Sequence, residues 1–357
     1  MSTMRPCTVL LTAGGGAGVP GVIRCLRHNG ERDIRVVVTD MCSDIASFYL
    51  ADSSHIVPPG HAPDYADAVL KIVRLEHVDI IFINNAAEML SLARHRAEFE
   101  QEGVYLSLPA LDTLELVNNK GSLYEVAHNL GLGVPRTLRV DRAEAFEKAV
   151  TELGYPKIPV CFKPEQGSGG RGFGILCQDA NSWKTFFETK ENAPYLSWDY
   201  LISVLRKTDV FPPLLVMEYL PGEEYSIDCL VDRGQPRYVI PRVRNQVSLG
   251  SSVVGTVVHS NEAIVFAQRL VASLGLHGNI NVQLKRAADG QLKLIEINPR
   301  LSGTVVLCYA AGVNLPYFGV KLGLGESLPD VEPRWGTKML RHWSEVFVSP
   351  HGGHVEL

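Results

Sequence analysis

Short apolar runs alternate with amphipathic stretches along the first third of the chain. The β-branched run Ile34 to Thr39 predicts a strand, and Thr8 to Leu11 and Ile80 to Ile83 predict two more. Pro20 to Arg27 and Tyr65 to Leu75 have the spacing of amphipathic helices, the first with a proline in its opening turn. This alternation of strand and helix predicts a parallel, doubly wound sheet.

Beyond the first third, the pattern mixes helices with antiparallel strands. Helices are predicted at Lys120 to Leu130 and Ala263 to Leu274. The turn sequences Asp232-Arg233-Gly234 and Asp289-Gly290 predict hairpins. The segment 190–213, which contains three prolines, is expected to be irregular. Strands are predicted at Pro159 to Lys163, Leu214 to Glu218, Ile227 to Val231, Tyr238 to Arg242, Ile280 to Leu284 and Leu292 to Ile297.

Composition narrows the class of protein. Hydrophobic residues make up 46% of the 357 residues and charged residues 20%, with a net charge of −5 and no Lys/Arg-rich run, so we expect no nucleic-acid partner. No stretch approaches the ~20 apolar residues of a membrane span, and we expect no membrane partner. The seven cysteines form no C-x-x-C pair and are odd in number, which favours reduced thiols in a cytoplasmic protein. A homo-oligomer is compatible with the sequence.

A glycine-rich turn, Gly14 to Gly18, follows the first predicted strand, and Asp40 ends the second. This layout is close to a dinucleotide-binding fingerprint, but the spacing departs from G-x-G-x-x-G because position 19 is Val, so we expect no NAD site. Two other interpretations remain. The glycines could serve only a tight strand–helix turn, or their amides could face a small anionic substrate.

A second glycine-rich segment runs from Lys163 to Gly174 and contains five glycines, of which Gly174 is the last. A lysine supplies a point charge for phosphate oxygens, and glycines allow backbone N–H groups to approach those oxygens and the loop to close as a lid. No G-K-[ST] follows, which excludes a Walker A loop. A plain glycine-rich hairpin is the structural alternative.

Three side chains with oxygen ligands are predicted on neighbouring strands near the C-terminal end of the pattern. Glu296 and Asn298 are two residues apart on one predicted strand and share a face, and Gln283 lies on the strand before it. Mg²⁺ prefers such oxygen ligands. Arg300 follows two residues later, where it could clamp a phosphoryl group as charge develops. A solvated polar face is the alternative, but it fits poorly with the apolar neighbours Leu294, Ile295 and Ile297.

Together these motifs resemble the ATP-grasp superfamily, and in particular one ATP-binding half of the carbamoyl-phosphate synthase large chain. The resemblance covers roughly residues 8–325. Its most specific parts are Asn119-Lys120, Lys163 with its glycine loop, the segment Met217 to Glu224, and Glu296-Ile297-Asn298-Pro299-Arg300. The sequence departs from the family pattern at Asn119, where an aspartate is frequent, and it contains one module where the complete synthase has two.

The resemblance implies a Mg-ATP site, with Mn²⁺ as an acceptable substitute metal. It implies that Gln283, Glu296 and Asn298 bind the metal. It implies that Arg300 stabilises the transferring group and that Arg242 is a second contact to phosphate or substrate. The residues that it assigns to ATP are Lys120, Lys163, Gly169, Gly170, Glu218, Tyr219, Leu220 and Glu224, with adenine received by backbone groups of 218–220 and ribose by Glu224.

The predicted fold class is therefore α/β and α+β: an ATP-grasp fold with an N-terminal parallel-sheet pre-ATP-grasp domain. The predicted divisions are 1–117 for that domain, 118–220 for a linker helix and lid, and 221–357 for the C-terminal α+β subdomain. The predicted function is an ATP-dependent carboxylate–amine ligase that works through an acyl phosphate, with small-molecule carboxylate and amine substrates. The alternatives are phosphorylation of bicarbonate or carbamate, and a non-catalytic nucleotide sensor.

Overall fold

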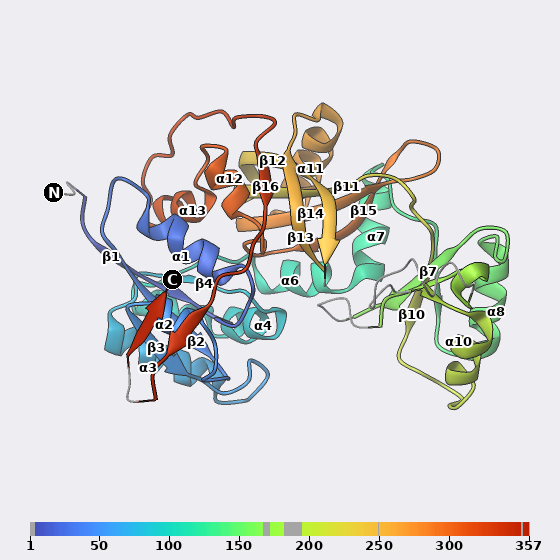
Figure 1. Cartoon of the computed structure of the whole chain (residues 1–357), viewed down its shortest axis with the longest axis horizontal. Coiled ribbons are helices and arrows are strands. Elements are labelled where there is room, and N and C mark those ends of the chain that lie inside the picture. Colours follow the sequence, from blue (N-terminus) through green and yellow to red (C-terminus); the bar gives the residue numbers. More distant parts are fainter. Residues whose placement is uncertain (1–3, 167–171, 182–194, 249, 351–352, 357) are drawn as a thin grey trace. The chain divides into compact units, whose positions relative to one another are not determined.

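The computed structural model describes residues 4–166, 172–181, 195–248, 250–350 and 353–356 (Figure 1). They fall into two compact units. The first contains the residues up to 115 together with 225–283 and those from 297, and the second contains 116–224 and 284–296. The three-part division at residues 117 and 220 stays a prediction. Each unit is described by itself below.

The first unit begins with a five-stranded sheet of order β3-β2-β1-β4-β5 in which all pairings are parallel. The predicted doubly wound sheet is thus confirmed. The chain leaves the centre at β1 toward one edge and returns to the other side of β1 at β4, so the switch point lies between these two strands. The bounds are β1 (Cys7–Leu11), β2 (Ile34–Asp40), β3 (Ser53–Ile56), β4 (Ile80–Phe82) and β5 (Tyr105–Leu106).

Helices cover both faces of this sheet, which explains its near-continuous apolar strands. On β1, Val9 and Leu11 pack in a core with α1, whereas Leu10 packs in a second core with α3, as the two-residue period requires. The helices are α1 (Val19–Arg27), α2 (Ser47–Leu50), α3 (Tyr65–Glu76), α4 (Ala86–Arg94), α5 (Arg96–Gln101) and α6 (Leu111–Asn118).

A six-stranded sheet of order β15-β14-β11-β12-β13-β16 follows. The predicted hairpin at Asp232-Arg233-Gly234 is confirmed. Asp232 pairs with Gln235 across a two-residue turn in which Arg233 and Gly234 have φ of 47° and 82°, as a type I′ turn requires. The strands are β11 (Glu224–Asp232), β12 (Gln235–Ser248), β13 (Ser251–Val257), β14 (Gly278–Arg286), β15 (Leu292–Asn298) and β16 (Lys338–Leu340). The helices are α11 (Asn261–Ser273), α12 (Val306–Ala310) and α13 (Leu315–Gly323), and a last hairpin is formed by β17 (Val346–Val348) and β18 (His354–Glu356).

The second unit has its own five-stranded sheet of order β6-β10-β7-β8-β9, in which all pairings except β8 with β9 are antiparallel. Its core lies between this sheet and the helices α8 and α10. The strands are β6 (Thr137–Val140), β7 (Val160–Pro164), β8 (Gly174–Leu176), β9 (Tyr195–Leu196) and β10 (Leu214–Glu218). The helices are α7 (Lys120–Asn129), α8 (Ala143–Glu152), the 3₁₀ turn η1 (Gln178–Asn181) and α10 (Trp198–Leu205).

The expectation that 190–213 is irregular was wrong for its described part, because α10 lies within it. The Ser197 side chain caps this helix by accepting a hydrogen bond from the backbone N–H of Tyr200. Leu201, Ile202 and Leu205 are buried at the spacing of one helical face. The prolines at 212 and 213 follow the helix and do not interrupt it.

Across these described segments, no helix is long and apolar enough to cross a membrane.

Candidate functional site

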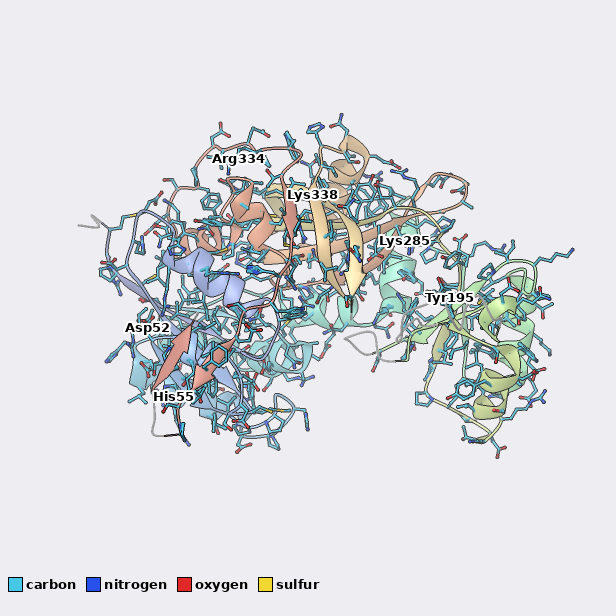
Figure 2. All side chains as sticks on the ribbon, in the orientation of Figure 1. Asp52, His55, Tyr195, Lys285, Arg334 and Lys338 are labelled. Carbon is cyan, nitrogen blue, oxygen red and sulfur yellow. The ribbon has the colours of Figure 1, made fainter. Side chains whose placement is uncertain are left out.

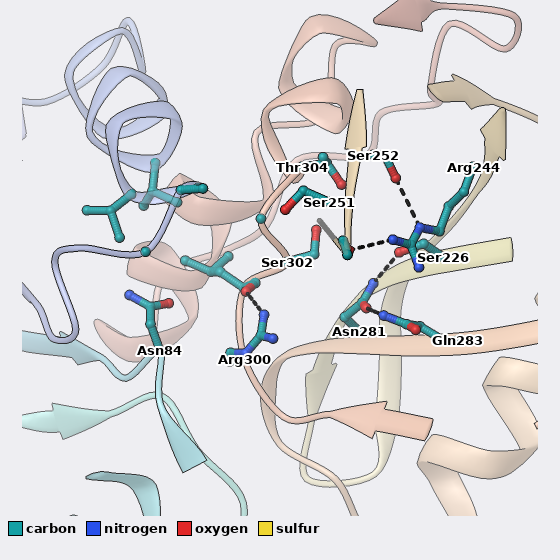
Figure 3. A pocket seen from close by; sticks show the side chains of 18 residues that line it. Asn84, Ser226, Arg244, Ser251, Ser252, Asn281, Gln283, Arg300, Ser302 and Thr304 are labelled. Atoms are coloured by element: carbon teal, nitrogen blue, oxygen red, sulfur yellow. Dashed lines mark hydrogen bonds between the residues drawn. The ribbon is translucent and has the colours of Figure 1, made fainter. Parts of the chain in front are cut away.

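A polar cavity of about 250 Å³ lies in the first unit, at the carboxyl end of the switch point between β1 and β4 (Figure 3). The turn before α1 and its first residues, Asn84 in the loop after β4, the face of the second sheet and the loop after β15 all contribute to it. The lining residues are Gly16, Ala17, Gly18, Val19, Val22, Asn84, Ser226, Arg244, Gly250, Ser251, Ser252, Asn281, Gln283, Arg300, Leu301, Ser302, Gly303 and Thr304.

The predicted glycine turn forms one wall of this pocket. A Cβ atom on Gly18 would lie 2.6 Å from the Cα atom of Gly303, so only glycine permits this approach of two backbone segments. Asp40 does not line the pocket: its Oδ2 accepts from the backbone N–H of Gly15 at 2.8 Å, and its Oδ1 from that of Cys42 at 2.9 Å. The acid that a dinucleotide site would use for ribose therefore holds the turn itself.

Two arginines reach the pocket from different segments. Arg300 donates from Nη1 to the carbonyl of Leu301 at 2.9 Å and from Nη2 to Asn298 Oδ1 at 3.3 Å. Arg244 donates from Nε to Ser252 Oγ at 3.1 Å and from Nη2 to the carbonyl of Gly250 at 2.6 Å. In the view of Figure 3 these two side chains lie on either side of Asn281. The prediction included Arg300 but missed Arg244.

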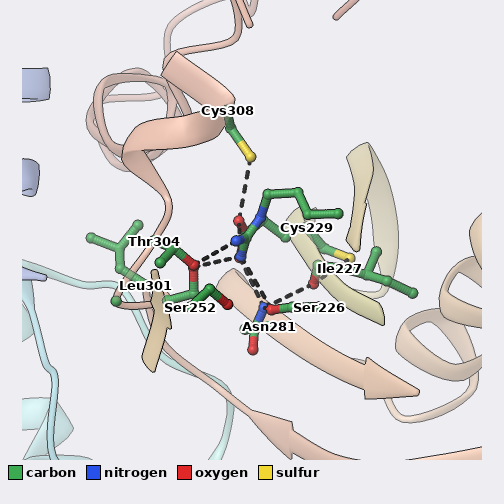
Figure 4. Close-up of polar contacts among 12 residues, drawn as sticks. Ser226, Ile227, Cys229, Ser252, Asn281, Leu301, Thr304 and Cys308 are labelled. Carbon is green, nitrogen blue, oxygen red and sulfur yellow. Dashed lines mark hydrogen bonds and ion pairs between the residues drawn. The ribbon is translucent and has the colours of Figure 1, made fainter. Parts of the chain in front are cut away.

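Arg242, which the resemblance assigns to a phosphate or substrate contact, does not line the pocket. It is buried and forms an ion pair with Asp228, with 2.7 Å between Nη2 and Oδ2. It also donates to Ser302 Oγ at 2.9 Å, to Ser226 Oγ at 3.1 Å and to Thr304 Oγ1 (Figure 4). These three hydroxyl residues line the pocket, so Arg242 supports the pocket wall from behind.

Arg242 and Arg244 are two residues apart on β12, and their residue types give no signal that separates them. The partner Asp228, which comes from β11, decides which of the two is buried. In the register of the two strands Arg242 lies opposite Ser226 and Asp228 opposite Ile240, so Asp228 reaches Arg242 diagonally, and a local sequence pattern gives no signal for this contact. Register on β12 is further shifted by an irregularity between Val243 and Gln246.

The three predicted metal ligands lie on β14 and β15. Gln283 lines the pocket, and its Nε2 donates to Asn281 Oδ1 at 3.4 Å, which turns its side-chain oxygen away from Asn281. Asn298 Oδ1 accepts from Arg300. The described residues contain no group of three or more His, Cys, Asp or Glu side chains that could hold a metal, and the predicted set has one carboxylate, Glu296. The metal assignment stays a prediction.

In the second unit, Lys163 is buried on β7. Its Nζ donates to the hydroxyl of Tyr124 at 2.9 Å and to the carbonyl of Ile295 at 3.1 Å. Burial lowers the pKa of Lys163 to about 8, although Glu296 acts in the opposite direction. Burial also lowers the pKa of Lys120, and the positive charge of Lys163 adds to this effect. Two predicted phosphate ligands and Glu296 thus share one neighbourhood.

The N-terminus of α7 accounts for the residue before Lys120. Asn119 Oδ1 accepts from the backbone N–H of Ser122 at 3.0 Å and so caps the helix. Asparagine and aspartate are nearly equal as N-caps. The departure at Asn119 therefore keeps the local structure that positions Lys120.

The predicted adenine and ribose contacts also lie in the second unit. Glu218 Oε1 accepts from the backbone N–H of Arg136 at 2.8 Å and from the Lys293 ammonium group, so its carboxylate is engaged with the protein. Glu224 Oε2 is 3.8 Å from Nζ of Lys285, which is labelled in Figure 2. Leu220 is buried and Tyr219 half-buried. Gly169 and Gly170 lie outside the described residues.

Two family models match separate parts of this chain. Residues 210–343 match the family model described as ATP-grasp in the biosynthetic pathway with Ter operon, and residues 9–107 match the PylC-like N-terminal domain. The arginine-specific carbamoyl phosphate synthase large chain of Geobacillus stearothermophilus is 24% identical over 74% of this chain and 24% of its own length. The chain thus spans about a quarter of the length of that relative.

Solved structures show the same fold. N5-carboxyaminoimidazole synthetase from Staphylococcus aureus, complexed with ADP, is 15% identical, with a TM-score of 0.67 over 94% of this chain and 82% of its own. L-amino acid ligase from Bacillus licheniformis is 15% identical, with a TM-score of 0.61 over 90% and 75% of the two chains. This chain therefore has the ATP-grasp fold, and two of its segments match the ATP-grasp and PylC-like N-terminal family models.

Proposed function

We propose that this protein is an ATP-dependent carboxylate–amine ligase that activates an acid as an acyl phosphate and releases ADP and phosphate. The observation that carries the proposal is the pocket of the first unit. Its wall combines the guanidinium groups of Arg244 and Arg300 with the glycine turn at 16–18, which is an arrangement of donors suited to a carboxylate. The ATP-grasp fold supplies the nucleotide-dependent half of the proposal.

The ATP phosphates would be held by Lys120 and Lys163. Lys163 is buried and has its pKa lowered, and a phosphate would stabilise its charged form. The engaged carboxylate of Glu218 fits the proposal that backbone groups of 218–220 receive the adenine. Glu224 would accept hydrogen bonds from the ribose.

Mg²⁺ would be held by oxygen atoms of Gln283, Glu296 and Asn298, where it would neutralise phosphate charge. The donor set suits a hard cation. The orientation of the Gln283 amide supports an oxygen ligand, since its nitrogen faces Asn281. Asn298 fits only after rearrangement, because its Oδ1 accepts from Arg300 and would have to leave that guanidinium group to bind a cation.

In the proposed reaction, a carboxylate oxygen of the acid attacks the γ-phosphorus of ATP, and the bond to the β,γ-bridging oxygen breaks to give ADP and the acyl phosphate. Arg300 stabilises the negative charge on the transferring group. An amine then attacks the acyl carbon and loses a proton, and inorganic phosphate leaves from the tetrahedral intermediate. The product is an amide or peptide bond.

Phosphorylation of bicarbonate or carbamate is the second candidate, and the likeness to carbamoyl phosphate synthase favours it. This chain spans about a quarter of that relative, however, and the cavity of about 250 Å³ is large for bicarbonate. A nucleotide sensor without catalysis is the third candidate. The presence of all three predicted metal ligands and of Arg300 argues against it.

A screen of ADP release tests the proposal. Carboxylic acids are crossed with amines in the presence of ATP and Mg²⁺, and the products are identified by mass spectrometry. We expect ADP release that requires an organic acid, and a product whose mass is the sum of acid and amine less water. ADP release with bicarbonate alone would favour the second candidate, and no release with any combination would favour the sensor.

A further inference from the structure

We infer that the acid taken by the pocket of the first unit carries at least two anionic groups and no ammonium group. A dicarboxylate and a phosphorylated carboxylate share this chemistry. The inference rests on the proposed function, because it assumes that the pocket binds the acid. It deepens that function by naming the class of acid.

The first observation is the charge of the lining. Two guanidinium groups, those of Arg244 and Arg300, face the pocket, and no Asp, Glu, Lys or aromatic side chain lines it within the part of the chain that is described. Each guanidinium is held by a different segment, one by the turn at 250–252 and the other by the strand end at 298–301. Two separately held cations suit two separate anionic groups.

The second observation is the direction of the hydroxyl groups. Arg242 is a donor only, so the oxygens of Ser226, Ser302 and Thr304 must act as acceptors toward it. The hydrogen of each hydroxyl is not used in that contact and can be donated to a ligand. Asp228 holds Arg242 in place through the buried ion pair. Because the buried pair fixes Arg242 as their donor, these three hydroxyls remain able to donate to a ligand in the pocket.

The third observation is the positive field behind the lining. Arg341 donates from Nη2 to the carbonyl of Gly303 at 2.6 Å, directly behind the wall. Burial lowers the pKa of Arg341, and the charges of Arg24 and of Arg242, which is itself paired with Asp228, lower it further. An anionic ligand would relieve this repulsion.

These features together disfavour a zwitterionic α-amino acid as the activated acid. Its ammonium group would enter a pocket that is lined by two cations. No carboxylate lines the described pocket, so the amide oxygens of Asn84, Asn281 and Gln283 would be its strongest side-chain acceptors. A like charge in such a site costs affinity. In an acid with a second anionic group, that group would instead accept hydrogen bonds from one of the two guanidinium groups.

Binding of defined probes to the full chain tests the inference without turnover. Calorimetry without nucleotide compares succinate and phosphoglycolate with propionate, a single anion, and with aspartate, which adds an ammonium group to succinate. We expect one or both dianions without ammonium to bind at least about ten-fold more tightly than propionate and aspartate, as one further charge-assisted contact provides. The two dianions distinguish a dicarboxylate from a phosphorylated acid.

Arg244→Gln should reduce dianion affinity to the level of propionate, and Arg244→Lys should restore part of it. The matched control is Arg74→Gln, which removes an exposed arginine that pairs with Glu102 on the surface. Circular dichroism verifies that each variant folds. Equal affinity for aspartate and succinate, undiminished dianion binding to Arg244→Gln, or binding of no probe would overturn the inference.

The same probes distinguish failure of the inference from failure of the proposed function. Dianion binding without acid-dependent ADP release with any amine would contradict the ligase and leave the inference standing. Acid-dependent ADP release with aspartate or propionate, but not with the dianions, would overturn the inference and leave the ligase standing.

Discussion

Replacing Glu88 by Gln should stabilise the protein at alkaline pH and leave its stability unchanged in acid. Glu88 lies on α4 with 6% of its surface exposed, and its Oε2 accepts from Thr12 Oγ1 at 2.7 Å. Burial raises the pKa of this carboxyl from 4.5 to about 7, opposed by the Thr12 hydrogen bond and assisted by the charge of Asp40. Glutamine keeps an acceptor for Thr12 but has no proton to lose.

The magnitude follows from proton linkage. Because the pKa is higher in the folded protein, the folded state binds more protons between pH 4.5 and about 7. Stability therefore falls as pH rises through that window and is constant above it. The difference between the two pKa values, 4.5 and about 7, corresponds to a loss of about 3 kcal/mol in the free energy of unfolding. The free energy of unfolding of Glu88→Gln should thus exceed that of the parent protein by up to ~3 kcal/mol at pH 8, and this difference should close near pH 4.5.

The assay is urea unfolding of parent and variant at several pH values from 4.5 to 8, followed by fluorescence. Exposed Glu98→Gln, which makes the same substitution on the surface, is the matched control. A gap for Glu88→Gln that is the same at every pH, or one that grows toward acid, would refute the reasoning, because neither follows from a carboxyl that is kept protonated by burial.

Three further predictions concern the proposed site and its support. Lys163→Ala should weaken Mg-ATP binding by about 1.5–3 kcal/mol in calorimetry, and an unchanged affinity of this variant would remove Lys163 from the site. The affinity of the parent protein for Mg-ATP should fall as pH rises through about 8, where Lys163 loses its proton. Glu296→Gln should lower turnover on the order of 10²–10³ with a smaller loss of ATP binding, and equal losses in both would contradict its proposed role. Asp228→Asn should destabilise the protein by about 3–5 kcal/mol in urea unfolding, because Arg242 would remain buried without its partner; a loss below 1 kcal/mol would contradict this.

The sequence predicts the fold well where local patterns decide the structure. The strands at Ile34 and Ile80 were found because they are short runs of apolar, mostly β-branched residues, and the helix at Tyr65 because its apolar positions repeat every three to four residues. The helix α10 was missed because prolines near it suggested a loop, although its buried positions Leu201 and Leu205 carry the helical period.

The candidate site could be predicted only in part, because its geometry depends on contacts between distant segments. Arg300 was identified through its position after the strand that carries Glu296. Arg244 was missed because only the pairing of Arg242 with Asp228 shows which arginine is buried. The approach of Gly18 to Gly303, which forms the pocket wall, involves residues 285 positions apart that no local pattern connects.

The most direct test of the account is isotope transfer from the acid to phosphate. An acid that supports ADP release is labelled with ¹⁸O in its carboxylate and incubated with an amine, ATP and Mg²⁺, and the phosphorus products are examined by ³¹P NMR. Because the carboxylate oxygen attacks the γ-phosphorus and leaves with it, we predict one ¹⁸O atom in each inorganic phosphate and none in ADP. Unlabelled phosphate, or AMP that contains ¹⁸O together with pyrophosphate, would contradict the acyl-phosphate mechanism.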